Sequence, residues 1–415
     1  MVQAGLSPPD ARSAAAEAAG FGFPLLLVDA IRRTHPVGAN RTLDLPIDGG
    51  SIAPGLACEH PLTTATSIWA DLRDGPVRID LPGLGDRYWS VSVFDAHGRR
   101  MPPPRGTRTT PSRFVLSRPG ETPSGDSWQA STDLVWLVVR IAAASEQDLE
   151  AARRLASEIR VSSAANHPLP RGKVEPPLQA PIDLVATLPP HRYFHRLSSL
   201  LARFPTPLAP AQRQALARLN LGGTPFQMPG SPALKDAIAQ GLADVMARLK
   251  EARTASPALG WRQAHDGPAP RSVWPRIATL GAPAPEDVLI LICDRDSDGR
   301  RLSGTSSYEL VFGPGDAPPA DGFWTLICAG ESMRAALDSR AAVAEADGSM
   351  RVRISQGPQP NTTNAIKAPA GRLQLRLSLF WPRPGALTNG WRPPALHRVV
   401  ETSPPVDFAH RGPSP

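Results

Sequence analysis

Hydrophobic and polar residues alternate strictly in several short segments of the chain. Between residues 372 and 379, leucine occupies every second position, and Arg, Gln or Ser occupies the positions between. The same period of two appears in PVRIDL (76–81) and RYWSVSVFD (87–95). Side chains of a strand point alternately to the two faces of its sheet, so this pattern predicts half-buried β-strands.

Strands of this kind gather in two separate regions. The first region adds SRFVLS and the apolar run DLVWLVVRI (133–141), which fits a central strand, and it ends in a helical pattern near 149–159. The second region contains DVLILICD, SYELVF, FWTLICA and MRVRIS. Short strands separated by turn residues are typical of β-sandwiches, so we predict two jelly-roll-like β-sandwich domains.

A helical period occupies the chain between the two β regions. In YFHRLSSLLARF (193–204), apolar residues recur every three or four positions. In 231–252, Ser231 and Pro232 form a typical helix start ahead of an apolar stripe. The predicted fold is therefore α+β but mainly β, with two sandwich domains joined by a helical linker region.

The chain of 415 residues is long enough for two cores. Its 48 prolines and 34 glycines fit short strands and turns better than long helices. The predicted parts are a flexible N-terminus (1–20), an N-terminal β-sandwich domain (21–165), a Pro-rich linker and helical region (166–285), a C-terminal jelly-roll-like domain (286–402) and a flexible tail (403–415).

Charge and cysteine content exclude several classes of protein. The net charge is +7, and arginine supplies nearly all the positive charge. These arginines are scattered and are not interleaved with aromatic residues, so we expect no nucleic-acid partner. The three cysteines, Cys58, Cys293 and Cys328, lie far apart. We interpret them as buried thiols, since neither a disulfide framework nor a zinc knuckle fits this spacing.

The N-terminal sequence predicts the compartment. Residues 1–20 lack the basic segment and following apolar run of a secretory signal. The apolar stretches FPLLLVDAI and VWLVV are too short to span a bilayer. We therefore expect a cytoplasmic protein with no membrane contact, or a periplasmic one if a leader was removed.

The first β region offers four candidate ligand-binding residues. Asp95 ends a predicted strand, and Arg108 lies in the following loop, where its guanidinium fork could bind a carboxylate or a sugar hydroxyl. A structural salt bridge that fixes the loop explains the same pair. Trp69 and Tyr88 are candidates for stacking on a sugar, although aromatic residues of strands usually belong to the core.

The second β region offers Asn364 and Lys367. Both lie in the polar loop that enters the alternating strand at 373–379, and the loop is expected at the rim of a sheet. A side chain at this rim could bind a ligand. A turn-forming role explains Asn364 almost equally well.

Two motifs have the spacing of metal sites. In DRDSDG, Asp294, Asp296 and Asp298 alternate as in a calcium loop, but the final acid of such a loop is missing and the flanks are predicted strands. A hairpin turn is the preferred interpretation, and we expect no cofactor, with calcium as the alternative. His191 and His195 are one helical turn apart and could face one zinc ion, or simply face solvent.

Ordered motifs along most of the chain resemble a bacterial family. FPLLLVDAIRR, IWADLRDGPVRIDLP, DRYWSVSVFDAHG and VWLVVR are similar to the domain of unknown function 1254. DSDGRRLSGTSSYELVF, PPADGFWTLI and APAGRLQLRLSLFWP are similar to its usual C-terminal companion, the domain of unknown function 1214. The resemblance implies domains like the jelly rolls of an N-glycan-cleaving amidase, and by fold analogy alone a carbohydrate-related role.

Several polar positions of this family are replaced here. Ala65 stands in place of Tyr, Ala329 and Gly330 in place of Tyr-Asp, and Ala365 in place of Trp beside the retained Asn364. The first interpretation is a protein that processes or binds a carbohydrate-like polar ligand at a groove between the β domains, with hydrolase chemistry if it is an enzyme. The second is a non-catalytic scaffold or partner-binding paralogue that has lost the site. A homo-oligomer is compatible with both.

Overall fold

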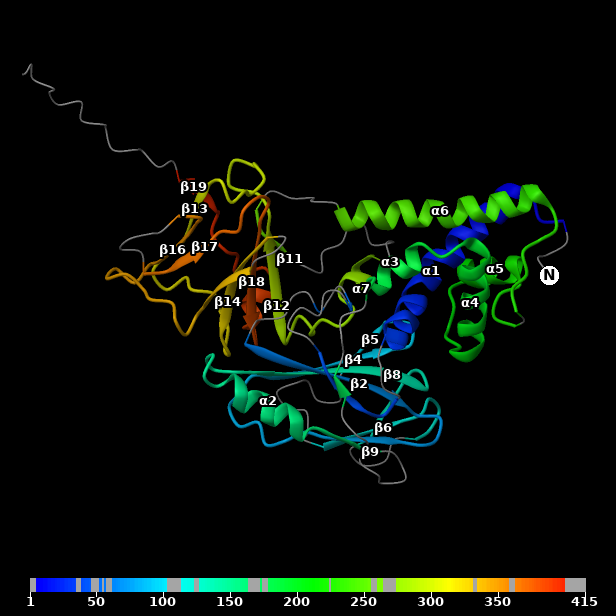
Figure 1. Cartoon of the computed structure of the whole chain (residues 1–415), viewed down its shortest axis with the longest axis horizontal. Helices are drawn as coiled ribbons and strands as arrows, with labels where there is room; N and C mark the ends of the chain where they lie inside the picture. Colours follow the sequence, from blue (N-terminus) through cyan, green and yellow to red (C-terminus); the bar gives the residue numbers. More distant parts are fainter. Residues whose placement is uncertain are drawn as a thin grey trace, which may run out of the picture. The chain divides into compact units, whose positions relative to one another are not determined.

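In the computed structural model, the chain divides into two compact units (Figure 1). Unit 1 comprises Met1–Ala255 and Ala264–Asp287, and unit 2 comprises Ser256–Gln263 and Val288–Pro415. The structure describes residues 5–34, 39–45, 52–53, 56, 62–102, 113–122, 127–162, 172–173, 178–223, 225–254, 260–263, 274–330, 334–357 and 363–399. The predicted flexible tail at 403–415 lies outside the described residues.

Unit 1 contains two β-sheets that share a hydrophobic core. Sheet A has six strands in the order β10-β1-β2-β8-β4-β5, and sheet B has four in the order β7-β6-β3-β9. Their bounds are β1 Thr42–Asp44, β2 Thr63–Asp71, β3 Val77–Asp80, β4 Trp89–Asp95, β5 Arg100–Met101, β6 Arg113–Ser117, β7 Ser127–Gln129, β8 Leu134–Ala142, β9 Arg160–Ser162 and β10 Gly172–Lys173. Alternate residues of both sheets, such as Ile68, Leu137 and Phe114, are buried together with helix α2 (Leu149–Glu158).

Both faces of sheet A are buried. All nine residues of β8 are buried, and this strand lies in the sheet between β2 and β4, as its continuous apolar sequence predicted. On the side away from sheet B, Trp69 stacks on Trp136 with ring centroids 5.3 Å apart, and both join the core formed with the helices. Sheet A is therefore the middle layer of unit 1.

The helices of unit 1 pack around helix α1. The bounds are α1 Pro8–Thr34, α3 Pro181–Ala186, α4 Pro190–Arg203, α5 Pro210–Leu219, α6 Pro232–Thr254 and α7 Trp274–Ala278. Helix α1 contacts α3, α4, α5 and α6. A Cβ at Gly241 of α6 would lie 2.4 Å from the carbonyl oxygen of Arg12, so only glycine allows this close approach of α1 and α6.

The start of α1 differs from the prediction of a flexible N-terminus. Residues 8–20 are helical, and Ala11, Ala14, Ala15 and Ala18 are buried against the other helices. Alanine is the best helix former but a weak hydrophobic signal, so this face was missed in the sequence. Its small side chains allow the neighbouring helices to approach closely.

Helix α1 also alters the expectation about membranes. Among the described helices, it alone is long and apolar enough to cross a bilayer by length and composition. Its most apolar stretch of 18 residues has a mean hydropathy of 1.5, and 67% of this stretch is buried in the structure. The alanine-rich half continues the apolar stretch that the sequence analysis judged too short. A helix of this kind near an N-terminus fits both a signal sequence and a buried core helix, so the localisation is not determined.

Unit 2 contains a second pair of sheets. Sheet C has the order β11-β12-β18-β14-β15, and sheet F has the order β17-β16-β13-β19. The bounds are β11 Arg262–Gln263, β12 Val288–Cys293, β13 Ser307–Phe312, β14 Trp324–Ala329, β15 Arg334–Asp338, β16 Met350–Ser355, β17 Ala365–Lys367, β18 Gln374–Phe380 and β19 His397–Val399, with helix α8 at Pro384–Leu387. Leu375, Leu377 and Leu379 of β18 are buried with Leu310 and Val352 of the facing sheet.

The fold is thus α+β, with four mostly antiparallel sheets and eight helices within the described residues. The predicted alternation of β-rich and helical regions is present. Helices α3 to α7 do not form a separate linker, however. They pack with α1 into the same compact unit as the first β region, because α1 supplies the apolar face that covers them.

Candidate functional site

Asp95 holds a tight turn at the end of β4. Its Oδ1 accepts hydrogen bonds from the backbone N–H groups of His97 (2.9 Å) and Arg99 (2.8 Å). Its Oδ2 accepts a hydrogen bond from Ser131 Oγ at 3.1 Å. The residue is 2% exposed, so its carboxylate is engaged in forming the turn and does not face solvent.

Asp296 forms the same turn in unit 2. Its Oδ1 accepts hydrogen bonds from the N–H groups of Asp298 (3.0 Å) and Arg300 (2.8 Å). Asp298 itself forms an ion pair with Arg300 at 2.8 Å. Together with Asp294, these aspartates belong to a hairpin turn, and among the described residues no three His, Cys, Asp or Glu side chains are grouped to hold a metal ion.

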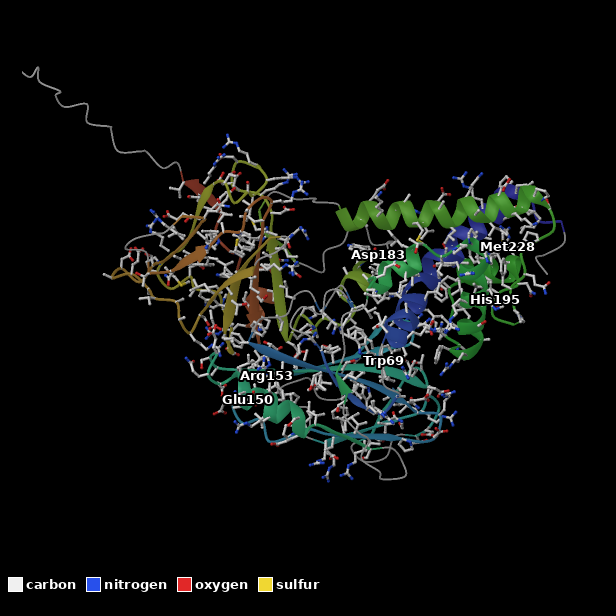
Figure 2. All side chains as sticks on the ribbon, viewed as in Figure 1. Trp69, Glu150, Arg153, Asp183, His195 and Met228 are labelled. Atoms are coloured by element: carbon white, nitrogen blue, oxygen red, sulfur yellow. The ribbon has the colours of Figure 1, made fainter. Side chains whose placement is uncertain are left out.

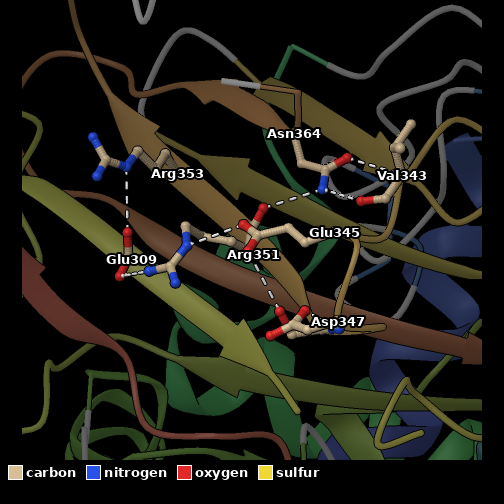
Figure 3. A network of polar contacts seen from close by, with 8 residues as sticks. Glu309, Val343, Glu345, Asp347, Arg351, Arg353 and Asn364 are labelled. Atoms are coloured by element: carbon tan, nitrogen blue, oxygen red, sulfur yellow. Dashed lines mark hydrogen bonds and ion pairs between the residues drawn. The ribbon is translucent and has the colours of Figure 1, made fainter. Parts of the chain in front are cut away.

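Asn364 connects two loops of unit 2 through its amide (Figure 3). Its Oδ1 accepts a hydrogen bond from Val343 N–H (2.9 Å), and its Nδ2 donates to the carbonyls of Val343 (2.8 Å) and Arg351 (3.1 Å). The residue is 2% exposed. This geometry corresponds to the turn-forming interpretation, while Lys367, at the end of β17, is exposed.

Trp69 and Tyr88, the other described candidates of the first β region, are buried. Trp69 and Tyr88 are 1% and 4% exposed, so neither presents a face on which a sugar could stack. Arg108 lies outside the described residues. Among the described candidates of unit 1, Asp95, Trp69 and Tyr88 are therefore all buried.

A pocket with a volume of about 710 Å³ lies in the helical layer of unit 1. It is formed by the C-terminal half of α1, by α3 and α4, and by Phe226. Its apolar wall consists of Leu26, Leu184, Val185, Leu188 and Phe226, and its polar wall includes Asp29, Arg33, His191, Arg192, His195 and Arg196. Figure 2 labels His195 on α4. Pockets of about 300–1,000 Å³ with an apolar wall and a few polar groups are typical small-molecule sites.

Charge is distributed unevenly over the polar wall of the pocket. Asp29 accepts two hydrogen bonds from Arg196, at 2.9 and 2.6 Å, and forms an ion pair with Arg33 at 3.1 Å. The side chain of Arg192 has no hydrogen-bond or ion-pair partner among the described residues. The wall thus contains one carboxylate and three guanidinium groups among the described residues, which gives it a surplus of positive charge.

Sequence reasoning placed His191 and His195 on one helix face but missed the pocket they line. The missing signal lay in α1, where Asp29 and Arg33 are one helical turn apart and both line the pocket. Each histidine is exposed, in line with the preferred interpretation of solvent-facing helix residues.

The structure is that of a two-unit α+β protein with a pocket of about 710 Å³ in the helical layer of unit 1. Two family models match the chain, each described as a protein of unknown function: DUF1254 over residues 58–163 and DUF1214 over residues 287–384. The chain combines a DUF1254 region with a DUF1214 region, as the sequence resemblance predicted. Among curated proteins, none matches the chain.

A solved structure supports the fold. The VPA0106 protein from Vibrio parahaemolyticus has a TM-score of 0.64 at 17% identity, with 94% of this chain and 100% of that chain covered. An uncharacterized protein from Burkholderia cenocepacia has a TM-score of 0.45 at 12% identity, with 94% of each chain covered. At this identity the likeness to the Vibrio protein concerns the fold alone.

Proposed function

We propose that the protein is a binding protein for an organic anion with an apolar body, such as a medium-chain carboxylate, and that the helical pocket of unit 1 is its site. The observation that carries this proposal is that one cavity combines an apolar wall with Arg192, an arginine that has no partner among the described residues. The hydrocarbon part of the ligand packs against Leu184, Leu188 and Phe226. We assign no reaction to the site.

The charge of the pocket supports an anionic ligand. Asp29 neutralises part of the charge of Arg33 and Arg196, whereas the guanidinium of Arg192 pairs with no acid in the described part of the chain. A guanidinium binds a carboxylate through two parallel hydrogen bonds, and a partly apolar setting strengthens the pair. A cationic ligand would have to approach three arginines at once, so the charge distribution also excludes that class.

The apolar anion replaces a sugar as the proposed ligand. With Trp69 and Tyr88 in the core, a carbohydrate has no aromatic platform among the predicted residues. The pocket lies wholly within unit 1, so the proposal does not depend on a groove between the two β regions. A jelly-roll connection of the facing sheets, and self-association of the chain, stay predictions.

Calorimetric titration of the full chain with decanoate tests the proposal. Decyltrimethylammonium, which has the same tail and the opposite head charge, is the control ligand. We expect saturable binding of decanoate only, and a loss of affinity of roughly tenfold in Arg192→Ala, because a hydrogen bond to a charged group contributes about 1.5–3 kcal/mol.

Arg154→Ala is the matched control variant. Arg154 is an arginine of helix α2 in the same unit, with a side chain that is 75% exposed and away from the pocket. Its substitution should leave decanoate affinity unchanged. Equal binding of the two ligands, or equal affinity of Arg192→Ala and the native chain, would rule the proposal out.

A further inference from the structure

Asp29 is the one acid in the described wall of the helical pocket, and both of its carboxylate oxygens accept hydrogen bonds. Arg196 donates to Oδ1 through Nη2 at 2.6 Å and to Oδ2 through Nε at 2.9 Å. Oδ2 also forms an ion pair with Nε of Arg33 at 3.1 Å. The side chain of Asp29 is 18% exposed, so water screens these contacts only in part. The fork of Arg196 is therefore directed at Asp29 and not at a ligand.

Helical spacing places Arg192 beside this pair. Arg192 and Arg196 are one turn apart on α4, and both line the pocket. Residues four positions apart on a helix have Cβ atoms about 5–6 Å apart. A head group that binds to the guanidinium of Arg192 therefore lies close to the pair of Arg196 and Asp29.

The charge of the head group decides how well it fits this arrangement. A single negative charge is satisfied by the fork of Arg192. A second negative charge would be repelled by the carboxylate of Asp29, and Arg196 could turn toward it only by losing two hydrogen bonds. Arg33 and Arg192 attract any anion, but both side chains are exposed, so solvent screens this attraction.

We propose that Asp29 is the specificity-determining residue of the pocket and that it restricts the site to ligands with a monoanionic head group. This inference rests on the function proposed above and narrows its ligand class to heads that carry one negative charge, as distinct from phosphate monoesters. Asp29 acts in two ways, by occupying the fork of Arg196 and by repelling a second charge. It makes no hydrogen bond to the ligand itself.

Calorimetric titration of the full chain at pH 8 with decyl sulfate and decyl phosphate tests this selection, with both probes kept below their micelle concentrations. The probes share the tail and the tetrahedral head, but at this pH the sulfate carries one negative charge and the phosphate two. We expect the native chain to bind decyl phosphate no more than about fivefold more tightly than decyl sulfate, because exposed cations add little for the second charge. In Asp29→Asn, the preference for phosphate should grow at least about tenfold, since the freed fork of Arg196 can then bind the second charge.

Asp29→Glu and Asp80→Asn are the matched controls. Asp29→Glu keeps the negative charge and should keep the native preference. Asp80 of β3 also pairs with two arginines, Arg78 at 2.9 Å and Arg113 at 2.6 Å, and its side chain is 23% exposed. Asp80→Asn changes the net charge of the chain as Asp29→Asn does, and it should leave the native preference unchanged.

Three results would overturn the proposal. The first is a larger preference of the native chain for decyl phosphate, which needs no substitution and so stands even if Asp29→Asn does not fold. The second is an unchanged preference in Asp29→Asn, and the third is an equal gain in Asp80→Asn. Each of these contradicts selection by Asp29 while decanoate still binds, whereas a native chain that does not bind decanoate contradicts the function proposed above.

Discussion

Asp95 and Arg192 are both charged residues of unit 1, but their surroundings differ. Asp95 is 2% exposed, and backbone N–H groups and a hydroxyl engage both of its oxygens. Arg192 is exposed beside an apolar cavity, and its guanidinium has no partner in the described part of the chain. Asp296, through its Oδ1, and Asn364 resemble Asp95, because they too form hydrogen bonds with backbone groups.

The contrast separates two uses of polar residues. A group whose hydrogen-bonding capacity is filled by backbone stabilises a turn, and its removal leaves buried donors unpaired. A group that keeps free capacity next to a cavity can bind a ligand, and its removal costs the fold little. Substitution of a filled turn residue should therefore lower the free energy of unfolding and leave ligand affinity unchanged. Substitution of a free pocket residue should lower ligand affinity and leave the free energy of unfolding nearly unchanged.

The largest effect is expected for Asp95→Ala. Loss of the carboxylate leaves two buried N–H groups and a hydroxyl without their acceptor, so the free energy of unfolding should fall by roughly 3 kcal/mol. Asp296→Ala removes the same two backbone contacts but no contact at Oδ2, which is buried without a partner, so its cost should be clearly smaller. Denaturant unfolding measures both, and equal losses would contradict the account of the two turns.

Asn364→Ala should come next, at roughly 2 kcal/mol, because three hydrogen bonds of its amide to backbone are lost. Lys367→Ala, three residues away and exposed, is the control and should change stability by less than about 0.5 kcal/mol. Decanoate affinity should be the same in both variants. A large loss of stability in Lys367→Ala would contradict the distinction between polar groups that are hydrogen-bonded to backbone and polar groups that are not.

Asp287 should make stability depend on pH. Burial raises the pKa of this carboxyl group from 3.8 to about 7, so between these values the folded state binds more protons than the unfolded state. The stabilising effect of the protonated form is complete at low pH and is lost as pH rises toward 7, with a slope of at most about 1.4 kcal/mol per pH unit. In Asp287→Asn this slope should disappear from unfolding curves measured between pH 5 and 8. An unchanged slope would show that the folded-state pKa is not raised.

The β layers were predictable from sequence because their signal is local. Leucines at every second position, from Leu373 to Leu379, are sufficient to identify β18, and an unbroken apolar run identifies the central strand β8. The tight turn of Asp95 also has a local signature, Asp-x-x-Gly-Arg, which recurs at Asp296. The sequence shows that the two turns are alike, but it does not show that their carboxylates accept hydrogen bonds from the backbone.

The pocket could not be predicted, because its walls come from segments far apart in sequence. Asp29 meets Arg196 only when α1 packs on α4, and the packing depends on an alanine face that carries little hydrophobic signal. Whether Arg192 is paired or free likewise depends on which acids the fold brings near it. Sequence reasoning therefore found the histidines of this wall and not the cavity.

The central claim is that the guanidinium of Arg192, which has no partner among the described residues, binds an apolar anion in the helical pocket. Calorimetric titration of decanoate into the native chain, Arg192→Ala and Asp95→Ala tests it most directly. The account predicts roughly tenfold weaker binding in Arg192→Ala, with a change in unfolding free energy below about 0.5 kcal/mol, and native affinity in Asp95→Ala at a temperature where that variant is folded. Native affinity in Arg192→Ala, or no binding of decanoate to the native chain, would contradict it.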